Sequence, residues 1–414
     1  MTTSLFKPES IHELAGVEPD LPFDDLEILG EITANSKVIG LGEPTHGQKE
    51  INQLRDRMTR YLIEHQGFRV VAVEDSAIRC RRINDAIVHG IGTPESALAM
   101  QNFWTWRTKE VLAMLEWLHD RNESHPEDVV RFIGVDIQDL ESPAVELAST
   151  LVRLGLEAEN PYLDRLAEIE TITFWGDESF DENMFQADLE MLAELRDIIV
   201  NLEHSDPPDV DLGLDCVLAL EQSLQLWREN RLAPPTGSAA RWNRRDDVMA
   251  TRTLAPTLNG EKVVLWAHNG HVQCEAFPGL PEGSITTGLA LRAERNLNYI
   301  AISGAFGSGS YRARSEASGE MQALDVGHPP AGSIDHYLWS ASDSPALIVD
   351  LEMPGTILFE DQITRWGDAS LLPDALMRTT VRPGLGSNAI AFVRQATPSE
   401  PLQSRTQPGH GKLI

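Results

Sequence analysis

The sequence predicts an α/β fold: a three-layer core with a largely parallel sheet and a helical insertion subdomain. Two observations carry this prediction. Short apolar runs rich in β-branched residues recur along the chain, and they are continuous rather than alternating, as in strands buried on both faces. Amphipathic helical patterns separate the first of these runs, and strands that alternate with helices favour parallel pairing with helices on both faces.

The predicted strands are the apolar runs at 37–43, 68–75, 129–136, 261–269, 297–303, 345–351 and 389–394. A leading helix is predicted around 23–34. Between the strands, the stretches 50–67 and 109–120 each place their apolar residues on one helical stripe. The segment 305–342 is rich in Gly, Ser and Ala, which predicts a hairpin and loops.

A long helix-rich stretch between the third and fourth predicted strands interrupts the alternation, and we interpret it as an inserted subdomain. The resulting division has five segments: a helical lead-in at 1–36, a first part of the α/β core at 37–141, the helical insertion at 142–258, a second part of the core at 259–402 and a disordered tail at 403–414. No internal repeat is evident.

Composition and charge narrow the function. The 414 residues carry a formal net charge of −30, so a nucleic-acid partner is not expected, because phosphate binding needs basic surface. No apolar run is long enough for a membrane span, and no secretory signal is evident at the start, so the cytoplasm is the expected compartment. Only six of the basic residues are lysines. This acidic, lysine-poor composition fits either salt tolerance or a genome that favours arginine codons. The oligomeric state is not predicted.

The three cysteines are too few and too scattered for a disulfide framework or a cysteine-based zinc site. We expect Cys80, Cys216 and Cys274 to be buried thiols. Cys274 follows a pair of histidines closely, so it could line a site without taking part in chemistry.

Four predicted strands end in polar or ionisable side chains. These are Glu43 with His46, Glu74 with Asp75, Asp136 with Gln138, and His268 with His271. In open α/β sheets, ligands bind beyond the carboxyl ends of the strands, so these groups are expected to meet in one site and to shift one another's pKa values. Each of them alone has a structural explanation. Glu43, for example, could simply favour the start of the following helix.

The residue types at this edge limit the chemistry. The chain has no G-x-S-x-G elbow, no H-E-x-x-H and no Walker-type loop. A histidine oriented by a glutamate is the usual equipment for deprotonating water, and a second histidine pair could stabilise an oxyanion or protonate a leaving group. This arrangement favours direct hydrolysis of an ester or lactone. The same groups could instead hold a divalent metal ion in a metal-dependent hydrolase, or bind a small molecule without catalysis.

Several boxes of the sequence, in order, resemble the erythromycin esterase family. They are "GEPTHG" at 42–47, "FWTW" at 103–106, "FIGVDIQ" at 132–138, an R-D-x-x-M-A box at 245–250 and "WAHNGHV" at 266–272. The resemblance runs from about residue 36 to about residue 402. It implies an α/β core with a helical subdomain, a substrate cleft between them, and a small-molecule ester or macrocyclic lactone, such as a macrolide, as substrate.

The resemblance also implies roles for the site residues. His46 would be the general base, Glu43 and Glu74 would hold and tune it, and His268 and His271 would face the substrate carbonyl or leaving group. No cofactor is expected, and the metal-dependent alternative given above stays open.

Further residues are expected around this centre. Arg55 could bind a carbonyl oxygen or pair with Glu74, or it could simply be a surface arginine. Trp104 and Trp106 could form an apolar wall for the substrate. The remaining candidates are two substrate-binding residues, Asp136 and Gln138, and two residues that brace the insertion, Arg245 and Asp246.

Overall fold

The structure, a computed structural model, describes residues 6–402 except for 158, 175–178, 203–206, 234–237, 277–279, 295, 315–319, 354–361, 367–376 and 382–385. The predicted disordered tail at 403–414 lies outside the described residues. None of the described helices is both long and apolar enough to cross a membrane.

A nine-stranded, mostly parallel sheet forms the centre of the described molecule, which confirms the predicted fold class. Its strands are β1 (Ile11–Leu14), β2 (Val38–Glu43), β3 (Val70–Ser76), β4 (Arg131–Asp136), β5 (Val263–His268), β6 (Ile300–Arg314), β7 (Met321–Val326), β8 (Ala346–Asp350) and β11 (Ala389–Ala396). The order is β1-β8-β11-β6-β2-β5-β3-β4, with β7 paired to β6.

The central part of the sheet is parallel and its margins are not. Strands β11, β6, β2, β5, β3 and β4 pair in parallel, whereas β8 is antiparallel to β11 and β1 is antiparallel to β8. Strand β6 continues well beyond the end of β2 and turns back as β7, which is the hairpin predicted within 305–342. A separate antiparallel pair consists of β9 (Gln362–Trp366) and β10 (Met377–Val381).

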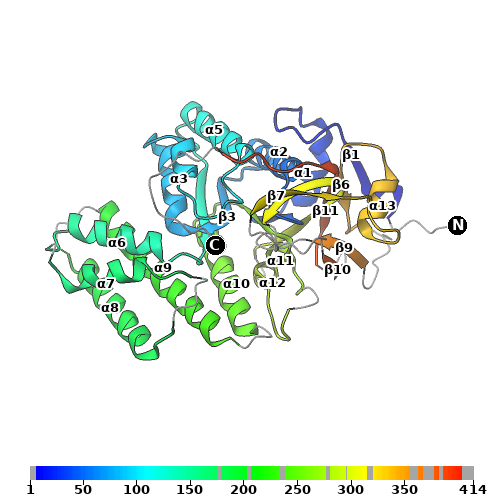
Figure 1. Ribbon diagram of the computed structural model, residues 1–414. Helices are drawn as coiled ribbons and strands as arrows, with labels where there is room; N and C mark the ends of the chain where they lie inside the picture. The colour runs from blue at the N-terminus through cyan, green and yellow to red at the C-terminus, as the bar shows by residue number, and fades with distance from the viewer. Residues whose placement is uncertain are drawn as a thin grey trace.

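Helices cover both faces of the sheet (Figure 1). One face packs on α1 (Glu27–Thr33), α2 (Lys49–Gln66), α3 (Ala77–His89) and α5 (Lys109–Ser124). The other face packs on α10 (Ala239–Leu254), α11 (Asn269–Val272) and α12 (Thr287–Ala293). The alternation within β2 explains this division, because Ile39 and Leu41 join the first core and Val38 joins the second. The remaining helices of the core are α4 (Pro94–Leu98) and α13 (Ile334–Ala341), with short 3₁₀ turns at Pro8–Ser10, Asp24–Leu26 and Ala255–Asn259.

The interval between β4 and β5 is helical, and Figure 1 shows most of it as a green group beside the sheet. Its helices are α6 (Glu141–Arg153), α7 (Pro161–Glu170), α8 (Glu182–Val200), α9 (Pro207–Leu232) and α10. Helices α6 to α9 share a hydrophobic core of their own. Helix α10 differs, because its Met249 and Ala250 pack into the core of the sheet. Residues of α10 can therefore reach the carboxyl ends of the strands.

The N-terminal segment is not only helical. The leading helix predicted at 23–34 is present as the 3₁₀ turn Asp24–Leu26 followed by α1, but β1 precedes it and joins the main sheet beside β8. The run at 11–14 is too short for its sequence pattern to predict a strand. Its extended conformation depends on pairing with β8, which is distant in sequence.

Candidate active site

Glu43 and His46 form the first half of the site. Glu43 is the last residue of β2, and the chain turns at once, so that Nδ1 of His46 lies 2.5 Å from Oε1 of Glu43. Burial raises the pKa of Glu43, but the charges of Arg55 and His46 lower it more, so the carboxyl is ionised. An ionised carboxylate only accepts hydrogen bonds, so Nδ1 of His46 carries the proton and the lone pair of the neutral ring lies on Nε2.

Arg55 lies beneath Glu43 and is buried. Its Nη2 donates to Oε2 of Glu43 at 2.6 Å and to Oδ1 of Asn52 at 2.5 Å, and its guanidinium lies 4.5 Å from the ring centroid of Trp266. Arg55 therefore supports Glu43 from the first turns of α2. Its ion pair is with Glu43 and not with Glu74, and only 2% of its side chain is exposed. The expectation that Arg55 binds a carbonyl oxygen of the substrate stays a prediction.

His268 faces His46 across the ends of neighbouring strands. Strands β2 and β5 pair in parallel with Glu43 opposite His268, and the rings of His46 and His268 have centroids 5.2 Å apart. The backbone N–H of Gly270 donates to Nδ1 of His268 at 3.1 Å, so the proton of the neutral ring lies on Nε2, 3.3 Å from the carbonyl oxygen of Pro44. The structure thus brings together the two histidines that the sequence placed on separate strands.

Glu74 links the site to helix α10. Its Oε2 accepts from the backbone N–H of His268 at 2.7 Å, and its Oε1 accepts from Nη2 of Arg245 at 2.7 Å. Burial raises the pKa of Glu74, but the charges of His271 and Arg245 lower it by more, so that the pKa lies well below its usual range. Glu74 is therefore a fixed negative charge that holds the start of the "HNGH" turn against α10.

Arg245 is a central member of the site rather than a brace for the insertion alone. Its Nε and Nη2 form a fork on Asp136 at 3.0 and 2.8 Å, and Nη2 also reaches Glu74. Burial lowers the pKa of Arg245, but Asp136 and Glu74 raise it above its usual range. About 16% of the Arg245 side chain is exposed, so it is among the more accessible groups of the cluster.

Asp136 is enclosed, which corrects its expected role in substrate binding. Its side chain has no exposed surface, and its oxygens accept from Arg245, from Nε2 of Gln138 at 2.7 Å and from the backbone N–H of Ile137 at 2.7 Å. It positions Arg245 and Gln138. Gln138 is only partly buried, so its predicted role in binding substrate stays a prediction.

His271 is buried behind Arg245 instead of facing the surface of the site, which corrects the expectation that it meets a substrate carbonyl. Its Nδ1 lies 2.8 Å from Oδ1 of Asp246, and its Nε2 lies 3.0 Å from Nη1 of Arg245 and 3.4 Å from Oε1 of Glu74. Burial lowers the pKa of His271, but Asp246 and Glu74 raise it overall. Asp246 in turn accepts from the backbone N–H of Thr287 at 2.7 Å, so it anchors α10 to α12.

The two tryptophans of the "FWTW" box have different surroundings. Trp106 is buried, and its indole N–H donates to the backbone oxygen of Glu74 at 3.0 Å, so it belongs to the support of β3 and not to an exposed wall. Trp104 is partly exposed and stacks with Arg312, whose guanidinium lies 5.3 Å from the ring centroid. The prediction of an apolar wall therefore stays open for Trp104 alone.

Sequence reasoning missed one aromatic side chain at the site, Trp242. Its ring lies over His271 with centroids 5.7 Å apart. Trp242 precedes Arg245 and Asp246 by three and four residues in α10, so the three share one face of the helix. Helical spacing from the R-D-x-x-M-A box could have identified it. The cysteines are buried, as expected.

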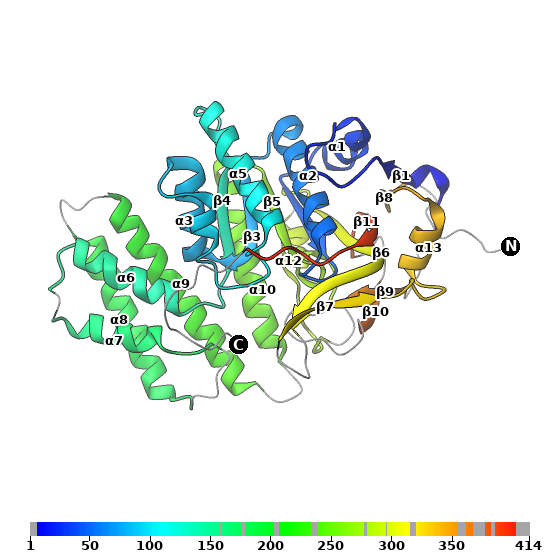
Figure 2. The same cartoon turned by 45° about the horizontal axis from the view of Figure 1, so that its top comes forward.

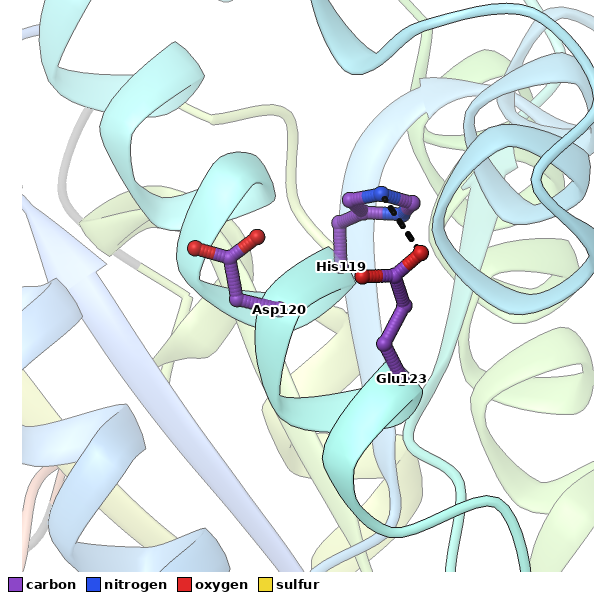
Figure 3. Close-up of side chains that lie close together, drawn as sticks. All are labelled: His119, Asp120 and Glu123. Carbon is purple, nitrogen blue, oxygen red and sulfur yellow. Dashed lines mark ion pairs between the residues drawn. The ribbon is translucent and has the colours of Figure 1, made fainter.

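A possible metal site lies away from this cluster. Among the described residues, one set of three side chains has ligand atoms close enough for a shared ion: His119, Asp120 and Glu123 on α5 (Figure 3), with Nε2 of His119 3.7 Å from Oε1 of Glu123. This part of α5 packs beside Val130, just before the amino end of β4. The candidate active site lies at the other end of the strands, their carboxyl ends. Two of its members are exposed acids, which commonly gather without an ion.

One acid-dependent effect follows from His268. Burial, followed by the charge of His46, lowers the pKa of His268 to about 4. Its unfolded value is about 6.5. A lowered folded pKa gives stability that is complete above about pH 6.5 and is lost as the pH falls toward 4. In urea unfolding at several pH values, we expect His268→Gln to lose less stability than the wild type over this window. If the free energy of unfolding changed with pH in the same way for the wild type and the variant, the result would contradict the burial of an uncharged His268 ring.

The fold and the side chains at the strand ends define an α/β protein with a histidine–carboxylate site. The chain belongs to the erythromycin esterase family: the family model described as "Erythromycin esterase" matches residues 63–382. The matched segment includes Glu74 and the residues from α10 and β5, while the "GEPTHG" box lies just before it. Membership of this family supports hydrolase activity.

Individual proteins agree with this assignment. The chain is 23% identical over 359 residues to a Bacillus subtilis protein named "Putative hydrolase YbfO", covering 79% of this chain and 76% of that one. It is 33% identical over 120 residues to "Erythromycin esterase type II" of Escherichia coli, covering 29% and 28% of the two chains. A structure of a mutant of the erythromycin esterase EreC, in its open conformation, superposes with a TM-score of 0.68 at 16% identity, covering 93% of this chain and 98% of that one. This last likeness concerns the fold.

Proposed function

We propose that the protein hydrolyses a carboxylic ester or a macrocyclic lactone, with His46 as the general base for the attacking water. The observation that supports this most directly is the chain of contacts from Arg55 through Glu43 to Nδ1 of His46. This chain fixes the ring so that Nε2 carries the lone pair, which is what deprotonation of water requires.

The reaction would proceed without a covalent enzyme intermediate. Nε2 of His46 takes a proton from water while the water oxygen bonds to the acyl carbon. The tetrahedral intermediate then collapses, the bond to the alkoxide oxygen breaks, and the protonated His46 returns its proton to that oxygen. The products are a carboxylate, after loss of its proton to solvent, and an alcohol. In a lactone both groups stay on one molecule, whose mass rises by one water.

His268 would stabilise the oxyanion. Its Nε2 carries the proton of the neutral ring, and the low pKa of about 4 keeps the ring neutral at the pH where His46 acts as a base. A neutral imidazole that donates a hydrogen bond can stabilise developing negative charge without transferring its proton. The donor would have to exchange its present acceptor, the carbonyl oxygen of Pro44, for the substrate.

A panel of esters and lactones, macrolides included, tests this proposal by mass detection of one added water. Each compound is assayed with and without a chelator, and the metal content of the purified protein is measured. Hydrolysis that survives chelation supports the histidine mechanism. Hydrolysis that is lost with a stoichiometric metal ion would favour the metal-dependent alternative, and binding of a panel compound without turnover would favour a binding protein.

A further inference from the structure

Two of the described arginines, one of them next to the segment that carries His46, lack the hydrogen-bond partners that the other described arginines have. Most arginine side chains in this acidic protein donate to a carboxylate, as in the pairs of Arg55 with Glu43 and of Arg79 with Asp139. Among the arginine side chains that the structure describes, Arg107 and Arg312 are the two with no hydrogen bond or ion pair to a protein acceptor. Both are partly buried. A buried cation ordinarily has a compensating charge.

Arg312 lies beside the segment that carries His46. It belongs to the part of β6 that continues past β2, and its backbone N–H donates to the carbonyl oxygen of Gly47 at 2.9 Å. The approach is so close that a Cβ on Gly47 would lie 1.7 Å from the carbonyl oxygen of Arg312. The glycine that follows His46 is therefore needed for β6 to pass this close to the site.

Arg107 lies in the loop that leads into α5. The residue before it, Trp106, donates to the backbone oxygen of Glu74, so the loop lies on the end of β3. The C-terminal segment fixes the loop, because the backbone N–H of Leu402 donates to the carbonyl oxygen of Arg107 at 3.0 Å. Figure 2 shows this segment in red, running from β11 toward α5.

The two guanidinium groups repel each other. Burial and then the charge of Arg107 lower the pKa of Arg312. Burial lowers the pKa of Arg107, with Asp75 acting in the opposite direction. Asp75 compensates poorly, because burial raises its own pKa well above the usual range and thereby favours the neutral acid. A chain with 64 acidic residues thus holds two partly buried arginines that act on each other electrostatically, and one of them, Arg312, contacts the residue after the proposed base.

Trp104 completes the arrangement. Its ring lies under the Arg312 guanidinium at 5.3 Å from the centroid, a contact that attracts the cation but accepts none of its N–H groups in the way that an oxygen does. A planar guanidinium held in this way presents a fork that matches the two oxygens of a carboxylate or phosphate. The partly exposed ring also offers an apolar surface to the carbon chain next to such a group.

We propose that Arg107, Arg312 and Trp104 form an anion-binding subsite next to His46, so that the substrate is an ester that also carries a carboxylate or phosphate group. This inference rests on the proposed function. It narrows the substrate class, because a neutral ester, or a macrolide whose amino sugar is cationic, would leave the two arginines unpaired.

Matched esters test the subsite. For the wild type, we expect kcat/KM for monoethyl glutarate to exceed that for diethyl glutarate by at least about tenfold, which is the scale of one hydrogen bond to a charged group. An ethyl ester with a terminal phosphate separates phosphate from carboxylate as the preferred anion. Arg107→Gln and Arg312→Gln should each bring the monoester-to-diester ratio toward one. Arg312→Lys keeps the charge but loses the fork, so its monoester-to-diester ratio should lie between those of the wild type and Arg312→Gln. Arg131→Gln removes a charge at the amino end of β4 and should leave the ratio unchanged.

Binding without turnover separates the two proposals. Glutarate and inorganic phosphate are titrated into each protein by calorimetry, after circular dichroism has shown that the variants are folded. If the wild type binds an anion and the affinity falls about 10- to 100-fold in the arginine variants, the subsite is supported. This holds even if no ester is hydrolysed, because a lack of hydrolysis would count against the hydrolase proposal alone. A wild type that binds neither anion, or that prefers the diester, overturns the subsite and leaves hydrolysis to be judged separately.

Discussion

Replacing His46 with asparagine is expected to lower kcat for ester hydrolysis by about 10²- to 10⁴-fold, the usual contribution of a positioned general base. The asparagine amide can still donate a hydrogen bond to Glu43 from nearly the position of Nδ1, so the support from Arg55 stays in place. What is lost is the basic nitrogen at the position of Nε2. The measurement is a full rate profile on the best ester of the panel, together with the thermal unfolding midpoint.

The midpoint should change little, because His46 is partly exposed and Glu43 keeps its ion pair. The control is His119→Asn, which removes an imidazole from the part of α5 near the amino end of β4 and should leave the rate unchanged. A rate in His46→Asn near that of the wild type would mean that another group activates the water. A large drop in the midpoint would instead assign His46 a structural role.

Replacing Arg245 with leucine is expected to destabilise the protein by about 3–5 kcal/mol at neutral pH, which is typical when one partner of a buried ion pair is removed. Arg245 neutralises two enclosed carboxylates, Glu74 and Asp136, at 2.7 and 2.8 Å. Without it both are left buried with too little compensating charge, and Asp136 has no exposed surface through which water could solvate it. Urea unfolding at pH 7 measures the loss.

The loss of stability should shrink as the pH falls. In the wild type, Glu74 has a folded pKa below its unfolded value of 4.5, so it stabilises the fold above that value. Without Arg245 one of the two charges that lower the pKa of Glu74 most is gone, so the folded pKa rises toward the unfolded value, and the difference in stability from the wild type shrinks as the pH falls toward that value. Adding Glu74→Gln and Asp136→Asn should restore most of the lost stability at pH 7.

A matched control is Arg131→Leu, whose pair with Glu261 is more exposed and is expected to contribute no more than about 1 kcal/mol. A similar loss in both arginine variants would show that the effect comes from shortening an arginine and not from stranding buried charge. A pH-independent loss in Arg245→Leu would lead to the same conclusion.

The sequence predicted the half of the site that lies on the strands. A continuous apolar run that ends in a charged residue marks both a buried strand and its carboxyl end, so Glu43, Glu74 and His268 could be assigned to one edge without knowledge of the strand order. Glu43 and His46 are only three residues apart, so their contact could also be predicted from the sequence around them. These predictions succeeded because the side chains are positioned by a few neighbouring residues and by the common direction of parallel strands.

Other roles depended on which surfaces meet. The spacing of Arg55 in α2 did not show that α2 would bury it against Trp266, nor that its partner would be Glu43 rather than Glu74. The "FWTW" box did not distinguish Trp106, which lies under a backbone carbonyl, from Trp104, which stays partly exposed. In each case the burial of one side chain was set by a neighbour distant in sequence.

By itself, the sequence determined the fold class, the direction of the central strands and the chemical types at their ends, because these follow from local periodicity and from the rule that parallel strands share one edge. Only the tertiary structure decided that Arg245 joins Glu74 to Asp136, that His271 lies behind it, and that Arg312 contacts Gly47 within reach of the charge of Arg107. These contacts join residues far apart along the chain, and their formation depends on how α10, β6 and the loop before α5 dock onto the sheet.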